Sequence, residues 1–130
     1  MTKLRENIVI IKINKSYREG ISETELYDVS RGCWKRKIAS VEKADYALAV
    51  VYGIVKEVYQ IDKWLPAENE VRETIPYNEA VDAGRIIFKG RIADEEIRKK
   101  YLDYSVAGLF KRGEVAPVKV ILKPQEIGIL

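Results

Sequence analysis

The sequence predicts a small α+β fold in which a curved, mainly antiparallel β-sheet or barrel is flanked by short helices. Two observations lead to this class. First, β-branched and aromatic residues gather in strand-like runs, which lie at 8–13, 46–61, 85–92 and 118–122. Second, the segments with helix-start signals are short and separate these runs. A chain of 130 residues can bury a core of its own, so we expect one domain over 1–130, either complete or part of a larger protein.

The first strand is expected over IVIIKI, residues 8–13, and the strongest strand signal follows at 46–61, YALAVVYGIVKEVYQI. Its two arms meet at Tyr52-Gly53, where the glycine supplies the positive φ angle of a two-residue hairpin turn. Alternate residues of a strand share a face. One expected face of the second arm holds Val55, Glu57, Tyr59 and Ile61, and the other holds Ile54, Lys56, Val58 and Gln60.

Two helices are predicted from their ends. Ser22-Glu23-Thr24-Glu25 is a capping-box pattern, which begins a helix over about 23–29, and Gly32 ends it. Asp94 is the expected N-cap of a helix over 95–101, because EEIRKKY begins with acids and ends with bases, in accord with the helix dipole.

Smaller signals complete the chain. Ser40 predicts a helical turn through Lys43, and Ser105 predicts one through Phe110. The polar stretch 65–84 contains two prolines and is predicted to be mostly loop. RIIFKGRI, 85–92, and VKVIL, 118–122, are the closing strands.

The net charge of +3 decides little, but the charges are unevenly distributed. Bases cluster at 31–37 and 98–112, whereas acids dominate 57–82. This pattern favours a polarised surface that attracts polyanions. Ordinary solvated faces are the alternative.

The composition excludes several kinds of chemistry. The chain has no histidine and one cysteine, which rules out within it a Cys/His zinc site, a Ser-His-Asp triad and a zinc deaminase centre. None of the 14 lysines has an acid two positions before it, as a common metal-dependent nuclease core requires. We therefore expect no catalytic residues, no metal and no cofactor.

The same composition suggests where the protein works. No apolar run approaches the roughly 20 residues of a membrane span, and the N-terminus lacks a cleavage signal. We expect a cytoplasmic protein that does not enter the membrane. With charged residues at 33% and few amides, the chain is typical of proteins from thermophiles.

The order of several segments resembles the YTH domain and its EVE and PUA-like relatives. The segments are IKIN (11–14), RGCW (31–34), DYALAVVYGIVKEVYQI (45–61), IIFKGRI (86–92) and APVKVIL (116–122). The resemblance, with the stretches between these segments included, covers about three quarters of the chain, and the order of the segments carries more weight than any one motif. The resemblance implies a domain that reads a modified base, as YTH domains read N6-methyladenine in RNA and as the recognition domains of McrB-type restriction proteins read DNA.

The resemblance also implies roles for single residues. Trp34 takes the place of the first tryptophan of an aromatic cage, Lys35 follows it with a backbone contact to the base, and Asn14 reads the base edge. A second cage tryptophan follows "F-K" in the family, where this chain has Gly-Arg-Ile at 90–92. Trp64 or Tyr17 is the candidate for that wall. Stacking on such a ring is worth about 1–3 kcal/mol per base.

A base enters a cage only after it leaves the stack, and phosphate contacts offset that cost. Cationic residues around the proposed cage and in the second basic cluster are the candidates for these contacts. They are Lys12, Arg31, Arg36, Lys37, Arg91, Lys99, Lys100, Lys111 and Arg112.

Structural roles are the alternatives for the key residues. Trp34 could pack in the core, Trp64 could plug the end of a strand, and Asn14 could cap a turn. The leading hypothesis is a reader of N6-methyladenine in DNA, acting as the specificity domain of a restriction system whose motor and nuclease lie elsewhere. A reader of methylated RNA is the alternative, and a protein-interaction or scaffold domain is the alternative from another class.

Overall fold

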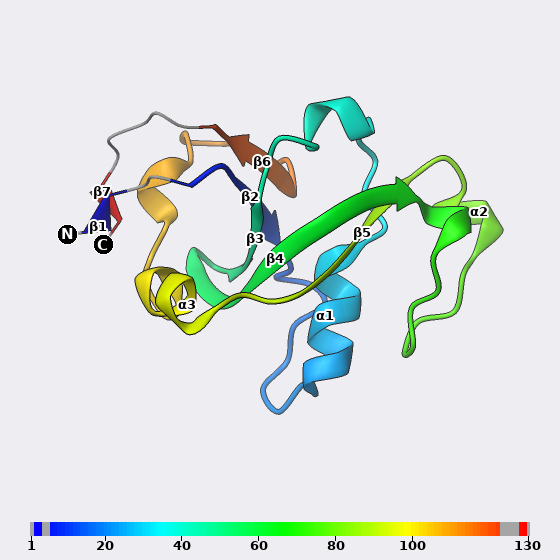
Figure 1. Ribbon diagram of the computed structural model, residues 1–130, viewed down its shortest axis with the longest axis horizontal. Coiled ribbons are helices and arrows are strands. Elements are labelled where there is room, and N and C mark those ends of the chain that lie inside the picture. Colours follow the sequence, from blue (N-terminus) through cyan, green and yellow to red (C-terminus); the bar gives the residue numbers. More distant parts are fainter. Residues whose placement is uncertain (1, 4–5, 123–127, 130) are drawn as a thin grey trace.

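The computed structural model describes residues 2–3, 6–122 and 128–129 (Figure 1). Five strands form the main sheet, and they are β2 (Ile8–Lys12), β3 (Tyr46–Val51), β4 (Ile54–Pro66), β5 (Ile86–Ile92) and β6 (Val118–Ile121). The α-helices are α1 (Glu23–Arg31), α2 (Glu79–Asp82) and α3 (Glu95–Tyr101). A separate pair joins β1 (Thr2–Lys3) to β7 (Gly128–Ile129).

The main sheet has the order β5-β4-β3-β2-β6. Only the β2–β3 pair is parallel, and the other three pairs are antiparallel. The β3–β4 hairpin lies at the centre. The described strands leave β5 and β6 as edges, so the sheet is open rather than a closed barrel. The expected α+β class with a small, mainly antiparallel sheet is confirmed.

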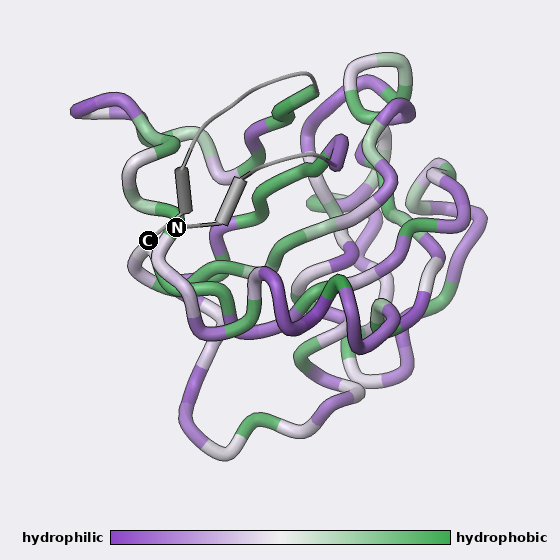
Figure 2. Tube along the Cα trace, turned by 60° about the vertical axis from the view of Figure 1, so that its left-hand side comes forward, coloured by the Kyte–Doolittle hydropathy of each residue, from purple (hydrophilic) through white to green (hydrophobic). Residues whose placement is uncertain are grey.

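Helices cover both faces of the sheet. On one face, α1 packs over a core that includes Val9, Tyr59 and Phe88. On the other face, α3 and the 3₁₀ turn Ala107–Leu109 pack over Ile10 and Leu48. Figure 2 shows the hydrophobic residues gathered along the strands, with hydrophilic segments mostly outside them. None of the helices among the described residues is long and apolar enough to cross a membrane.

The hairpin turn has the predicted position, but the second arm departs from simple alternation. A β-bulge places Val50 opposite Val55 and Ala49 opposite Glu57, so that Lys56 is an extra residue. Val55 and Val58 consequently pack on the same face, although strict alternation assigns them to opposite faces. The predicted alternation was therefore wrong across this bulge, because one inserted residue reverses the side-chain order. The arm also extends beyond Ile61 to Pro66.

The helix signals were accurate at α1 and less so elsewhere. The Ser22 hydroxyl accepts a hydrogen bond from Glu25 N at 3.1 Å, and α1 ends at Gly32 as predicted. Asp94 precedes α3 but makes no side-chain cap. Ser40 ends a 3₁₀ turn, Ile38–Ser40, rather than beginning one, because its hydroxyl donates backward to Lys37 O at 2.6 Å.

The loop prediction for 65–84 is correct over residues 70–78. β4 continues to Pro66, after which the 3₁₀ turn Ala67–Asn69 and the single helical turn of α2 interrupt the loop. The Ser105 hydroxyl accepts from Ala107 N at 3.3 Å, but the N-cap of the Ala107–Leu109 turn is Val106, one residue later than predicted.

Candidate nucleic-acid interface

The RGCW stretch closes the outer edge of β5. Trp34 N donates to Ile86 O and Ile86 N donates to Trp34 O, each at 2.9 Å. The indole Nε1 of Trp34 donates to Ser30 O at 3.0 Å, and the half-buried ring packs against the core on the α1 face. A Cβ on Gly32 would lie 2.7 Å from Cγ1 of Ile87, so a larger residue does not fit there. The backbone and the ring of Trp34 therefore both serve packing at this edge.

Arg31 is buried in the same edge, with a side-chain exposure of 5%. Its Nε donates to Phe88 O at 3.0 Å, and its Nη2 donates to Glu70 Oε2 at 2.7 Å. Nη1 also forms an ion pair with Asp28 Oδ1 at 3.7 Å. Buried charges are tolerated only when they are paired and hydrogen-bonded in this way. Arg31 consequently offers little surface to a phosphate.

Tyr27 completes the closure one helical turn earlier. Its hydroxyl donates to Gly90 O at 3.0 Å and accepts from Gly90 N at 2.9 Å. The Arg31 guanidinium lies 4.5 Å above the Tyr27 ring centroid. Tyr27, Arg31 and Trp34 thus satisfy backbone groups of alternate β5 residues, which protects an edge strand from pairing with another chain.

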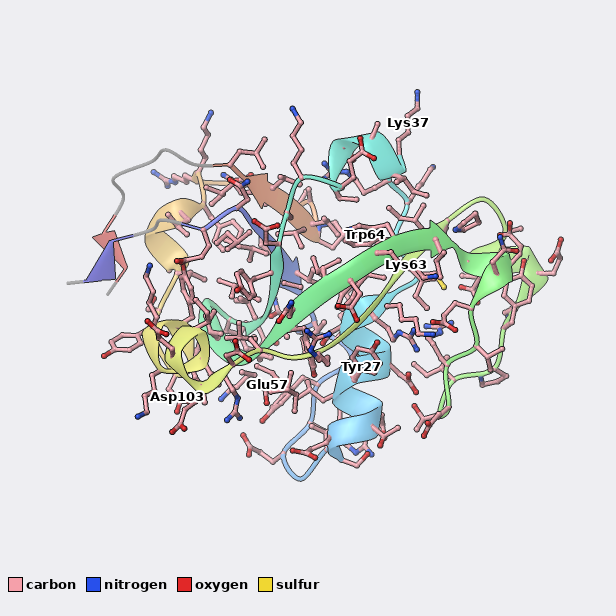
Figure 3. All side chains as sticks on the ribbon, viewed as in Figure 1. Tyr27, Lys37, Glu57, Lys63, Trp64 and Asp103 are labelled. Atoms are coloured by element: carbon pink, nitrogen blue, oxygen red, sulfur yellow. The ribbon has the colours of Figure 1, made fainter. Side chains whose placement is uncertain are left out.

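A pocket of about 420 Å³ opens between α1, β5 and the loop after β4, and we call it the helix–strand pocket. Its volume falls within the range of about 300–1,000 Å³ typical of small-molecule sites. The lining includes Glu23, Thr24, Tyr27, Asp28, Arg31, Tyr59, Glu70, Val71, Glu73, Lys89, Gly90, Arg91 and Ile92. The ring of Tyr27 stands 5.4 Å from that of Tyr59, at an interplanar angle of 51°. Figure 3 shows Tyr27 between α1 and the sheet.

Charges around the helix–strand pocket are mixed. Carboxylates of Glu23, Glu70 and Glu73 line it, and Glu70 is already paired with Arg31. One lining residue, the exposed Lys89, stands directly opposite the exposed Lys63 in the β4–β5 register. Like charges opposite each other destabilise a sheet, so this pair is not explained by stability.

Trp64 lies within the core rather than in a wall. It is 8% exposed, and its ring makes an edge contact with Phe88 at 5.3 Å between centroids. Its buried Nε1 has no hydrogen-bond partner among the described residues. This placement matches the strand plug that was the alternative for Trp64.

Asn14 and Tyr17 lie at the other end of the sheet. Asn14 Oδ1 accepts a hydrogen bond from Tyr52 N at 2.8 Å, and the Tyr17 ring centroid is 5.5 Å from the Lys56 ammonium. Trp34 pairs with Ile86 at the Pro66 end of β4, and the 13 residues of β4 extend roughly 40 Å. The five expected base-binding residues, Trp34, Lys35, Asn14, Trp64 and Tyr17, do not meet at one site.

The expected phosphate contacts also divide into separate groups. Lys35 and Lys37 are exposed beside Trp34, whereas the Arg36 Nη1 donates to Val118 O at 2.9 Å. Figure 3 shows Lys37 well away from Tyr27, which lines the helix–strand pocket.

The other expected cations belong to the opposite half of the molecule or to ion pairs. Arg91 pairs with Asp62 at 2.9 Å, Lys99 with Glu95 at 3.4 Å and Lys100 with Glu6 at 2.9 Å. These three partnerships leave each cation partly neutralised. Lys12 donates to Glu114 O at 3.0 Å, while Lys111 and Arg112 are exposed at the hairpin end of the sheet.

Sequence reasoning missed Tyr27 and Tyr59 as aromatic walls of a pocket. Tyr27 and Arg31 are four residues apart and share one side of α1, but the predicted helix over about 23–29 did not reach Arg31. The strand that this side would face could not be identified from spacing alone. Among the described residues, no group of three or more acidic, cysteine or histidine side chains is arranged to hold a metal ion.

No protein-family model, no curated protein sequence and no solved structure matches this chain.

Proposed function

We propose that the chain is a nucleic-acid-binding module that reads an extruded modified base, with N6-methyladenine in DNA as the first candidate. We place the base in the helix–strand pocket rather than at Trp34. In a restriction system, such a module would supply specificity, while a motor and a nuclease would lie in other domains or subunits.

The observation that carries the proposal is the combination of this pocket with two exposed lysines, Lys89 in its lining and Lys63 opposite it on β4. Tyr27 offers an aromatic surface whose orientation is fixed by two hydrogen bonds to Gly90. The carboxylates of the lining are acceptors for the N–H that remains on a methylated exocyclic amine. Lys63 and Lys89 are adjacent and exposed, and bound phosphates would relieve their repulsion.

A titration tests the proposal directly. Single-stranded DNA with one N6-methyladenine, its unmodified counterpart, the matching duplexes and the matching RNAs are compared at two salt concentrations. We expect the methylated DNA to bind most tightly and all affinities to fall with salt. Equal affinity for methylated and unmethylated strands contradicts the proposal, and tightest binding of methylated RNA favours the RNA alternative.

A pocket-filling variant locates the site. Thr24 is exposed on α1 and lines the helix–strand pocket, so Thr24→Trp should occupy the pocket without disturbing the core. We expect it to abolish the preference for the methylated strand. Glu96→Trp is the matched control, because Glu96 is exposed on α3 and does not line this pocket. A preference that survives in Thr24→Trp would remove the base from this pocket.

A protein-interaction domain is the second candidate, and one observation favours it. The segment between β4 and β5 exposes apolar side chains, with Val71 at 82%, Val81 at 52% and Tyr77 at 43%. Exposed apolar patches often mark docking surfaces. A scaffold would bind none of the oligonucleotides in the titration above.

A further inference from the structure

The turn of the β3–β4 hairpin carries a tyrosine where the backbone favours a smaller residue. Tyr52 has φ 46° and Gly53 has φ 85°, which is the pattern of a type I′ turn. Asn-Gly is the preferred pair for this turn, and a bulky residue at positive φ is unusual. The Tyr52 side chain is 80% exposed, so burial does not offset the backbone cost.

The turn is held rigidly from both sides. Asn14 Oδ1 accepts from Tyr52 N at 2.8 Å. On the other side, Val106 N donates to Gly53 O at 2.8 Å, and Val55 N donates to Tyr104 O at 3.0 Å. Strained residues persist when their surroundings hold them in this way, and they concentrate at functional sites. The Tyr52 ring is therefore presented to solvent from a fixed backbone.

A second pocket, of about 260 Å³, lies beside this ring. Its lining is Lys12, Asn14, Val50, Tyr52, Gly53, Ala107 and Phe110. The Lys12 ammonium stands 4.2 Å above the Phe110 ring centroid, and the Lys119 ammonium lies 5.7 Å from it. Aromatic rings and ammonium groups are thus combined at the hairpin end.

Two further cations follow a lining residue of this pocket in the sequence. Lys111 and Arg112 directly follow Phe110, and both are exposed. No ion pair involves either of them in the part of the chain that the structure describes. The nearby Glu114 carboxylate is engaged by Lys119 at 3.0 Å and by Lys111 N at 2.8 Å. The exposed Asp103, whose N donates to Val55 O at 2.9 Å, is a nearby acid, so the hairpin end combines aromatic rings with more cations than acids.

We infer that the hairpin end is a second contact site, which holds an unpaired stretch of nucleic acid. One base stacks on Tyr52, and the phosphates lie beside Lys111 and Arg112. An exposed ring offers its face to any base, so this contact is independent of sequence and of base modification, and it requires a single strand. The inference takes the class of partner from the proposed function but does not depend on the helix–strand pocket.

The first test replaces Tyr52 in the full chain and measures binding of a labelled, unmodified single-stranded DNA of about 12 nucleotides, with the same sequence in RNA as a parallel probe. Tyr52→Asn removes the ring and suits the turn, so the fold should survive. We expect affinity for the tighter-binding strand to fall about 5- to 150-fold. Tyr52→Phe keeps the ring and should bind like the original chain.

The second test concerns charge. Lys111→Ser should weaken binding and reduce the slope of log affinity against log salt by about 0.7 for one lost contact to a single strand. Lys43→Ser is the matched control, since Lys43 is exposed but lies next to the Ile38–Ser40 turn rather than at the hairpin end. Its slope should be unchanged.

The outcomes separate this inference from the proposed function. Unchanged affinity in Tyr52→Asn, or a wild-type chain that binds neither probe, overturns the inference. Tyr52-dependent binding without any preference for a methylated base supports the hairpin site and contradicts the base-reading proposal. A methyl preference that Thr24→Trp abolishes, together with an affinity that Tyr52→Asn leaves unchanged, supports the base-reading proposal and contradicts the hairpin site.

Discussion

The two ends of β4 use positive charge in opposite ways. At the Pro66 end, Arg31 and Arg72 are nearly buried and are paired with acids, Arg31 with Glu70 at 2.7 Å and Arg72 with Asp82 at 3.2 Å. At the hairpin end, Lys111 and Arg112 are exposed next to aromatic rings. The first arrangement stabilises the edge of the sheet, whereas the second is available to a polyanion.

This difference shows that a basic cluster in the sequence does not by itself mark an interface. Residues 31–37 contain four cations, yet Arg31 and Arg36 hold backbone carbonyls of β5 and β6. A cation that donates hydrogen bonds to the backbone of an edge strand has a structural role. Its effect should be visible in stability rather than in binding, and the following predictions separate these two readouts.

The largest effect is expected from Arg31→Met. Removing this guanidinium leaves Asp28 and Glu70 without their buried partner and frees Phe88 O. Breaking a buried ion pair typically costs about 3–5 kcal/mol, and chemical denaturation measures that loss. Arg18→Met is the control, because the Arg18–Glu25 pair is exposed and its loss should barely change the midpoint. If both variants lost the same free energy of unfolding, the expected difference between the buried and the exposed ion pair would be contradicted.

Trp34→Ala should have the next largest effect on stability. The half-buried ring packs against the core, and its Nε1 donates to Ser30 O at 3.0 Å. We expect a loss of about 3 kcal/mol, with any preference for a methylated base unchanged in the folded fraction. If the variant is as stable as the original chain but loses this preference, Trp34 is a wall of the base-binding cage.

Glu6 precedes β2 and pairs with α3, and it provides a pH-dependent test of stability. Burial raises the pKa of Glu6, but hydrogen bonds from the Tyr101 hydroxyl and the Lys100 ammonium outweigh it and hold the pKa below its ordinary value of 4.5. A lowered folded pKa means stability that is present above the ordinary pKa and lost as the pH falls through the folded value.

Glu6→Gln should accordingly cost about 1–2 kcal/mol at neutral pH. The difference from the original chain should shrink as the pH falls below about 4.5. Denaturation curves at pH 7 and pH 3 measure it. If the stability difference between the two chains grew toward acid pH, the pKa of Glu6 would be raised rather than lowered in the folded protein.

The smallest stability effect is expected from Tyr52→Asn. Asparagine tolerates the positive φ of 46° better than tyrosine does, and the exposed ring contributes little packing. We expect the free energy of unfolding to change by less than about 0.5 kcal/mol or to rise slightly. A loss above 1 kcal/mol would show that the ring has a structural role and would weaken the contrast between the two ends.

The sequence by itself determined the local elements of this protein. The five strands of the main sheet, the β3–β4 turn at Tyr52-Gly53 and the start of α1 at Ser22 follow from short-range patterns of β-branched residues, glycine and capping side chains. The bulge at Lys56 escaped this reasoning, because a single extra residue leaves no signal in an alternating pattern.

Only the tertiary structure decided which side chains come together. Trp34 and Asn14 lie in similar sequence contexts, each with lysines nearby, yet the register of β4 separates them to opposite ends of the sheet. Arg31 is buried because α1 packs its last turn against the edge of β5, a contact 57 residues away in sequence. Pairing across such distances depends on how strands are ordered and how helices pack, and neither is encoded in the spacing of neighbouring residues.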